Sequence, residues 1–152
     1  MISRIDADPA TAAKALRPDL HVVGVQTERF PAAWNAIHDG DRESRQATIA
    51  DGIGVKSPGA LTLPVIRALV DDVVLVSEDD IEQAILMLLE IEKTVVEGAG
   101  AVGLAALLKH RARFAGRKVG LVLSGGNIEP LVLAEIIQRG MTIVAAMPIR
   151  CA

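Results

Sequence analysis

The stretch Val73–Val74–Leu75–Val76–Ser77–Glu78–Asp79–Asp80 (VVLVSEDD) sets the character of the fold. Its four β-favouring apolar residues predict a buried strand. A serine followed by three acids is typical of a helix N-terminus, because the hydroxyl caps a free backbone N–H and the acids face the positive end of the helix dipole. Apolar residues at helical spacing then continue the pattern to about Lys93. A strand that leads directly into an amphipathic helix is the repeating unit of α/β folds.

Other segments repeat this alternation. Further strands are predicted at 20–25 and 118–123, and helices at 9–16, 31–37, 63–70, 101–110 and 131–139, the last of them ended by Gly140. The polar segment 39–46 is predicted to be a loop, and a strand-like run begins at Met141. We therefore expect an α/β fold with a mostly parallel sheet and flanking helices.

The composition narrows the functional class. The chain has 152 residues, 51 % of them hydrophobic and only 2 % aromatic, so we expect one domain with an aliphatic core. A net charge of −3 argues against nucleic-acid binding, and short apolar runs bounded by charges argue against a membrane span. The acidic N-terminus does not resemble a signal peptide, so a cytoplasmic location is expected. A single cysteine, Cys151, and three scattered histidines predict no metal site.

A polar corner follows the predicted strand 118–123. The sequence Gly120–Leu121–Val122–Leu123–Ser124–Gly125–Gly126–Asn127 ends in SGGN, which we call the SGGN corner (residues 124–127). Ligands of parallel α/β sheets lie beyond the carboxyl ends of the strands, and free N–H groups at the next helix start can bind an anion. From spacing alone, a binding site and a tight turn are equally supported.

A glycine motif precedes one of the predicted helices. Gly98–Ala99–Gly100–Ala101–Val102–Gly103 matches G-x-G-x-x-G, the dinucleotide fingerprint. That fingerprint also needs a preceding strand and an acid at the end of the next strand. Residues 94–97 are too few for a strand, and the next predicted strand ends in Leu123–Ser124. Close packing of a helix start is the favoured interpretation, with dinucleotide binding as the alternative.

Five segments, taken together and in order, resemble one family. They are VVGVQ (22–26), TIADG (48–52), VDDVVLVSE (70–78), EGAG (97–100) and LSGGN (123–127). The set resembles the C-terminal part of the threonine/serine dehydratases (ammonia-lyases), pyridoxal-phosphate enzymes with the fold of the tryptophan synthase β chain. The resemblance runs from about Ala12 to Gly140. It implies a partial fold of that type, a pyridoxal 5'-phosphate cofactor and a small amino-acid substrate, deaminated to a 2-oxo acid and ammonia.

The resemblance also implies roles for individual residues. Ser124 would hydrogen-bond the pyridine nitrogen of the cofactor, and Gly125 and Gly126 would let the backbone approach the flat ring. Glu97 would border the ring, although a capping acid is the alternative. Asp51 and Gly52 would line the substrate side, although an Asp-Gly turn is the alternative there.

The sequence departs from the family in other places. It lacks the Ser-Phe-Lys-x-Arg-Gly-type motif whose lysine binds the cofactor covalently, so no catalytic residue is assigned. The family's glycine-rich phosphate loop is missing too, and the segment RIDADP (4–9) looks inserted. Where relatives with a divalent-cation site place a carboxylate, this chain has Gln26, so no metal is expected there.

These departures predict how the chain is organised. We expect residues 1–140 to be the C-terminal portion of a dehydratase catalytic domain and 141–152 a truncated tail or linker. The isolated chain is expected to be inactive, to self-associate, and to need a missing N-terminal half; a split subunit, a fragment and a broken reading frame all fit. The alternative is a non-catalytic α/β partner subunit or a small-anion-binding module.

Overall fold

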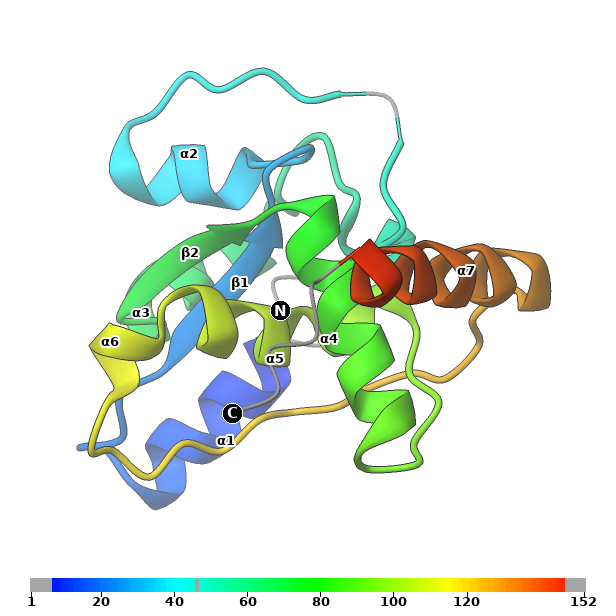
Figure 1. Cartoon of the computed structure of the whole chain (residues 1–152). Coiled ribbons are helices and arrows are strands. Elements are labelled where there is room, and N and C mark those ends of the chain that lie inside the picture. The colour runs from blue at the N-terminus through cyan, green and yellow to red at the C-terminus, as the bar shows by residue number, and fades with distance from the viewer. Residues whose placement is uncertain (1–6, 46, 147–152) are drawn as a thin grey trace.

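The computed structural model of the protein describes residues 7–45 and 47–146, and it has the expected α/β character. Helices flank a parallel pair of strands (Figure 1). The elements in order are α1 (Ala7–Leu16), β1 (Val23–Thr27), α2 (Ala32–His38), the short 3-10 helix η1 (Asp51–Ile53), α3 (Thr62–Leu69), β2 (Asp72–Val76), α4 (Glu78–Glu90), α5 (Gly98–Lys109), α6 (Arg111–Phe114) and α7 (Pro130–Ala146).

The sheet within the described residues consists of β1 and β2, which run parallel with Val23 opposite Asp72 and Thr27 opposite Val76. Successive strand residues point to opposite faces, and helices cover both. Val74 and Val76 pack into the main core with α4 and α5, whereas Val73 packs with residues of α2 and α3. The parallel pairing confirms the predicted fold class.

The junction between β2 and α4 is built as VVLVSEDD predicts. The backbone N–H of Asp80 donates to Ser77 Oγ at 3.2 Å, and the backbone N–H of Ser77 donates to Asp80 Oδ2 at 2.8 Å. This capping box satisfies two backbone donors at the helix start. The helix ends at Glu90, three residues before the predicted end, and Lys93 has a left-handed φ of 55°.

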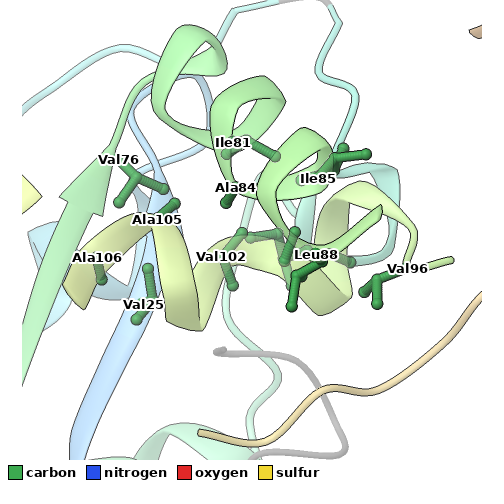
Figure 2. Packing of buried hydrophobic residues seen from close by; sticks show 14 of the residues in the cluster. Val25, Val76, Ile81, Ala84, Ile85, Leu88, Val96, Val102, Ala105 and Ala106 are labelled. Carbon is green, nitrogen blue, oxygen red and sulfur yellow. The ribbon is translucent and has the colours of Figure 1, made fainter. Parts of the chain in front are cut away.

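Small side chains allow close helix packing in the main core. Figure 2 shows Val102, Ala105 and Ala106 of α5 lying between β1 and α4, with Ile81, Ile85 and Leu88 of α4 facing them. All of these side chains are buried. The aliphatic core expected from the composition is therefore present, and it fixes α5 against the sheet.

The predicted strand 118–123 is not a strand in the structure. Residues 115–129 run as a long irregular segment between α6 and α7 (Figure 1). Val119, Leu121, Val122 and Leu123 are exposed. The sequence favours β structure here, but a strand needs a hydrogen-bonded neighbour, and no described strand pairs with this segment. The predicted strand at 20–25 is present but begins and ends later, at Val23–Thr27.

The prediction that Gly140 ends the last helix is wrong. Helix α7 continues through it to Ala146, so residues 141–146 are helical rather than strand-like. At this glycine α7 passes close to α4, since a Cβ at Gly140 would lie 2.3 Å from Leu86 Cδ1. A glycine inside a helix costs about 1 kcal/mol, and tertiary contacts such as those between α4 and α7 commonly override such a propensity. Residues 147–152, including Cys151, lie outside the described residues.

Candidate functional site

The SGGN corner lies against the start of α5. The backbone N–H of Glu97 donates to the carbonyl oxygen of Gly125 at 3.2 Å, and the backbone N–H of Asn127 donates to Glu97 Oε2 at 3.2 Å. Residues separated by about thirty positions are thereby held together. The half-buried Glu97 immediately precedes α5 but makes no side-chain capping bond, so its carboxylate serves the corner instead.

Glycines make this approach possible. Gly125 has a φ of 82°, and a Cβ there would lie 2.2 Å from Glu97 Oε1. A Cβ at Gly100 would lie 2.2 Å from the carbonyl oxygen of Ser124. At Gly100 the backbone leaves no room for a side chain, and at Gly125 the left-handed φ disfavours one. Gly98 and Gly100 of the G-x-G-x-x-G match serve close packing, as the sequence favours, whereas a Cβ at Gly103 would make only ordinary contacts. No described strand directly precedes this match.

The substrate-side candidates lie at the same helix start. The first turn of α5 packs against η1, where Asp51 Oδ1 accepts a hydrogen bond from the backbone N–H of Gly52 at 2.7 Å. A Cβ at Gly52 would lie 3.0 Å from Ala99 Cβ and 4.0 Å from Glu97 Oε1. Gly98 is also packed tightly, since a Cβ there would lie 2.2 Å from the carbonyl oxygen of Ile49.

The six predicted site residues thus gather around one helix start. Ser124 is half-buried, while Gly125, Gly126, Asp51 and Gly52 are exposed. Three of the exposed residues, Gly52, Gly125 and Gly126, present backbone and no side chain. Such a surface fits the face of a planar ring, because no side chain at the glycines blocks the approach.

Glu78 is a residue whose importance the sequence does not reveal. Thr27 Oγ1 and Thr48 Oγ1 donate to its Oε1 at 2.9 and 2.7 Å, and the backbone N–H of Ile49 donates to Oε2 at 2.8 Å. Glu78 therefore ties the end of β1 to the segment that leads into η1. Its place in the first turn of α4 indicates only a capping acid, because its partners lie 29 to 51 positions away.

Gln26 has a structural role. It is fully buried, and its Oε1 accepts hydrogen bonds from the backbone N–H groups of Ala33 and Trp34, both at 3.1 Å. The side chain thus holds the first turn of α2 against β1. Among the described residues, no group of three or more His, Cys, Asp or Glu residues is arranged to hold a metal ion.

Three of the five lysines are engaged away from this cluster. Lys14 pairs with Asp71 at 2.8 Å, and Lys109 pairs with both Glu28 and Asp80 at 2.8 Å. Lys93 Nζ donates to the carbonyl oxygen of Glu90 at 2.6 Å. No helix among the described residues is both long and apolar enough to cross a bilayer.

Comparison with known proteins identifies the class. The family model "Pyridoxal-phosphate dependent enzyme" matches residues 10–125, so the chain belongs to this family. The chain is 44 % identical over 134 residues to the L-threonine ammonia-lyase of Thermotoga maritima and 46 % identical over 134 residues to that of Geobacter sulfurreducens. Each match covers 87 % of this chain and 33 % of the relative, so the chain spans about a third of their length.

Solved structures of similar proteins superpose on this chain. A threonine deaminase from T.th. superposes with a TM-score of 0.75 at 39 % identity, over 82 % of this chain and 46 % of that one. Maize serine racemase superposes with a TM-score of 0.74 at 34 % identity, over 88 % of this chain and 43 % of that one. The fold is therefore part of the pyridoxal-phosphate enzyme fold that the resemblance implied.

Proposed function

We propose that this chain forms the ring-binding side of the active site of a pyridoxal-phosphate ammonia-lyase that deaminates threonine or serine to a 2-oxo acid and ammonia. The observation that carries the proposal is the junction of Glu97 with the SGGN corner, which brings the predicted cofactor contacts together at one place. The similarity to threonine ammonia-lyases supports the reaction class.

Ser124 is proposed to donate its hydroxyl hydrogen to the pyridine nitrogen of the cofactor. Pyridoxal phosphate, when bound, supplies the electron sink for loss of the substrate's α-proton and β-hydroxyl. A neutral hydroxyl can donate to an unprotonated ring nitrogen, whereas a carboxylate in its place would keep that nitrogen protonated. Ser124 would thus favour elimination over reactions that need a stronger sink.

The neighbouring residues position Ser124 and border the ring. Gly100 lets the Ser124 carbonyl rest against α5, and Gly125 lets the chain turn over the Glu97 carboxylate. Asp51 and Gly52 are proposed to line the substrate side of the cleft, next to Ala99. These residues bind and orient, and none is assigned as the group that moves the substrate proton.

The rest of the site is proposed to come from the part of the enzyme that this chain does not span. That part would supply the cofactor-binding lysine and the phosphate anchor, and the isolated chain would be inactive. On this proposal, residues 1–140 belong to the catalytic domain. The competing function is a non-catalytic partner subunit or a module that binds small anions at the SGGN corner.

The experiment is an absorption titration of the purified chain with pyridoxal phosphate, followed by borohydride trapping and peptide mapping. No stoichiometric adduct is expected with the chain alone. An adduct on a single lysine, abolished when the aldehyde is reduced beforehand, would contradict the proposed inactivity. Saturable binding of inorganic phosphate that is lost in Gly126→Asp would favour the anion-binding module instead.

A further inference from the structure

His38 ends α2, and both nitrogens of its ring face hydrogen-bond acceptors. Nδ1 lies 3.1 Å from the carbonyl oxygen of Trp34, one turn earlier in the same helix. Nε2 lies 3.0 Å from Oδ1 of Asp72, the first residue of β2, and the His38 side chain is 34 % exposed. These two contacts fasten the last turn of α2 to the sheet.

Neither acceptor has a proton to give. A backbone carbonyl only accepts, and Asp72 is a carboxylate at neutral pH. Partial burial pushes the pKa of Asp72 upward, but hydrogen bonds from Arg113 and from the backbone N–H of Val73 outweigh this and hold the pKa below its ordinary value of 3.8. A neutral imidazole has one N–H group and one lone pair, so it can donate to only one of the two oxygens. The imidazolium has two N–H groups and donates to both.

Other charged groups close to this contact belong to three different parts of the chain. Arg113 of α6 donates to Oδ2 of Asp72, so this carboxylate stays paired even without His38. Arg67 of α3 donates to a carbonyl oxygen in the last turn of α2 at 2.9 Å, and Arg42 lies over the neighbouring indole ring. The three arginines oppose a positive charge on His38, whereas Asp72 and the carbonyl end of the helix favour one.

The end of α2 also holds the start of the loop 39–45 (Figure 1). Asn35 Nδ2 donates to the carbonyl oxygen of Arg42 at 2.8 Å, and the backbone N–H of Arg42 donates to Asn35 Oδ1 at 3.1 Å. The backbone N–H of Gly40 donates to the carbonyl oxygen of Asn35 at 3.0 Å, and the Arg42 Cζ lies 4.5 Å from the centroid of the Trp34 ring. The order of this loop therefore depends on the order of the helix end.

We propose that His38, Trp34 and Asp72 form a proton-operated clasp, which fastens the end of α2 while His38 carries two ring protons and releases it when one is lost. Loss of that proton to solvent leaves one of the two acceptors without a donor. The clasp is therefore closed at low pH, and it opens as the pH rises through the range in which imidazole titrates. The expected consequence is a looser loop 39–45. None of these contacts involves the candidate site, so the clasp stands apart from the proposed function.

Trp34 reports on the protonation of His38. It is the only tryptophan of the chain, which has no tyrosine. Its ring stacks on that of His38, with the centroids 4.6 Å apart and 20° between the planes. A protonated imidazole quenches indole fluorescence more strongly than a neutral one. The Trp34 emission of the purified chain is therefore expected to rise between about pH 5 and about pH 8.

Three variants assign this rise. His38→Gln removes the titrating ring, so its emission is expected to be independent of pH. His21→Gln is the matched control, because Nδ1 of His21 lies 3.7 Å from Asp71 Oδ2, too far for a hydrogen bond, and the rise should persist. His38→Arg carries a permanent charge with several donors, so it is expected to keep the clasp closed and the emission constant.

Hydrogen exchange measures the release itself. After correction for the intrinsic effect of pH, the amides of residues 36–45 are expected to open about three- to tenfold more often at about pH 8 than at about pH 5.5, because a hydrogen bond is lost. His38→Arg should protect these amides equally at both pH values. The amides of α4 are the internal reference and should show no such change.

Several outcomes would overturn the clasp. Emission of the unchanged chain that does not vary with pH would do so, as would a rise that persists in His38→Gln or disappears in His21→Gln. A rise in emission without faster opening at 36–45 would also contradict it, since His38 would then titrate without holding the helix end. All of these readouts are independent of 2-oxo acid formation, so a failure of the clasp is distinguishable from a failure of the proposed function.

Discussion

The carboxylate of Glu97 accepts the backbone N–H of Asn127 at 3.2 Å, so the residue just before α5 holds the turn that begins the approach to α7. The same glutamate donates its own backbone N–H to the carbonyl oxygen of Gly125. One residue therefore fixes both ends of the turn that would face the cofactor ring. We therefore expect the stability of this turn to depend on the packing of the residues around Glu97.

Gly125→Ala is expected to destabilise the chain by about 1–2 kcal/mol, because the left-handed φ of 82° disfavours a Cβ, and more if Glu97 cannot move away from the added atom. The measurement is the free energy of unfolding in urea. Gly120→Ala, where no neighbour lies within 4 Å, is the matched control and should change the stability by less than about 0.5 kcal/mol. Equal losses would contradict the steric account.

Gly100→Ala and Gly103→Ala form a second pair within α5. At Gly100 the added Cβ would meet the backbone carbonyl of Ser124 at 2.2 Å, so the corner must shift and the chain should lose stability. At Gly103 the nearest atoms are side-chain atoms of Leu121 at 3.7 Å and beyond, and alanine should stabilise the helix by up to about 1 kcal/mol. Thermal unfolding monitored by circular dichroism measures the sign of the stability change for each variant. A stabilised Gly100→Ala would refute the predicted contact.

Glu78→Gln is expected to cost about 1–3 kcal/mol, because the donors of Thr27, Thr48 and Ile49, all at least half-buried, lose a charged acceptor. Hydrogen exchange should also quicken in residues 48–53, which lead to the substrate-side candidates. Glu90→Gln at the exposed end of the same helix is the control, with an expected change within about 0.5 kcal/mol. Unchanged exchange at 48–53 would show that Glu78 does not hold this segment.

The lowered pKa of Asp80 leads us to expect that the stability of the chain depends on pH. Partial burial pushes the pKa of its carboxyl upward, but hydrogen bonds from Lys109 and Ser77 outweigh this and hold the pKa below its ordinary value of 3.8. Because the folded pKa is the lower one, this stabilisation is complete above pH 3.8 and is lost as the pH falls through the folded pKa.

Asp80→Asn is therefore expected to be less stable than the unchanged chain near neutral pH, with a difference that shrinks as the pH falls below about 4. Urea unfolding at several pH values measures it. Asp79→Asn in the same helical turn, where the carboxylate is exposed, should show a much smaller dependence. A constant difference for Asp80→Asn across the range would contradict the linkage.

Local signals in the sequence account for much of the fold. Ser77 and the acids after it predict the capped start of α4 because a capping box depends on residues three positions apart. The valines of β2 predict a strand, and the strand forms because its partner β1 lies beside it. The same reasoning fails at 118–123, where the propensity is equally strong but no described strand lies beside the segment.

Tertiary packing decides the features that the sequence does not predict. Gly140 looks like a helix end, yet α7 continues through it where the helix passes close to Leu86 of α4. Glu78 looks like one of three acids in a first turn, and only folding brings Thr48 and Ile49 to it. The candidate site could be predicted from the sequence because the resemblance names its residues, whereas spacing alone does not separate SGGN from an ordinary turn.

The most direct measurement is 2-oxo acid formation from L-threonine and L-serine after the chain is mixed with the amino-terminal part of the Thermotoga maritima relative and pyridoxal phosphate. The account predicts no activity for either polypeptide alone, activity for the mixture, and a large loss with Ser124→Ala while the two polypeptides still associate. An associated mixture that forms no 2-oxo acid, or one whose activity is unaffected by Ser124→Ala, would contradict the claim that this chain supplies the ring-binding side of an ammonia-lyase.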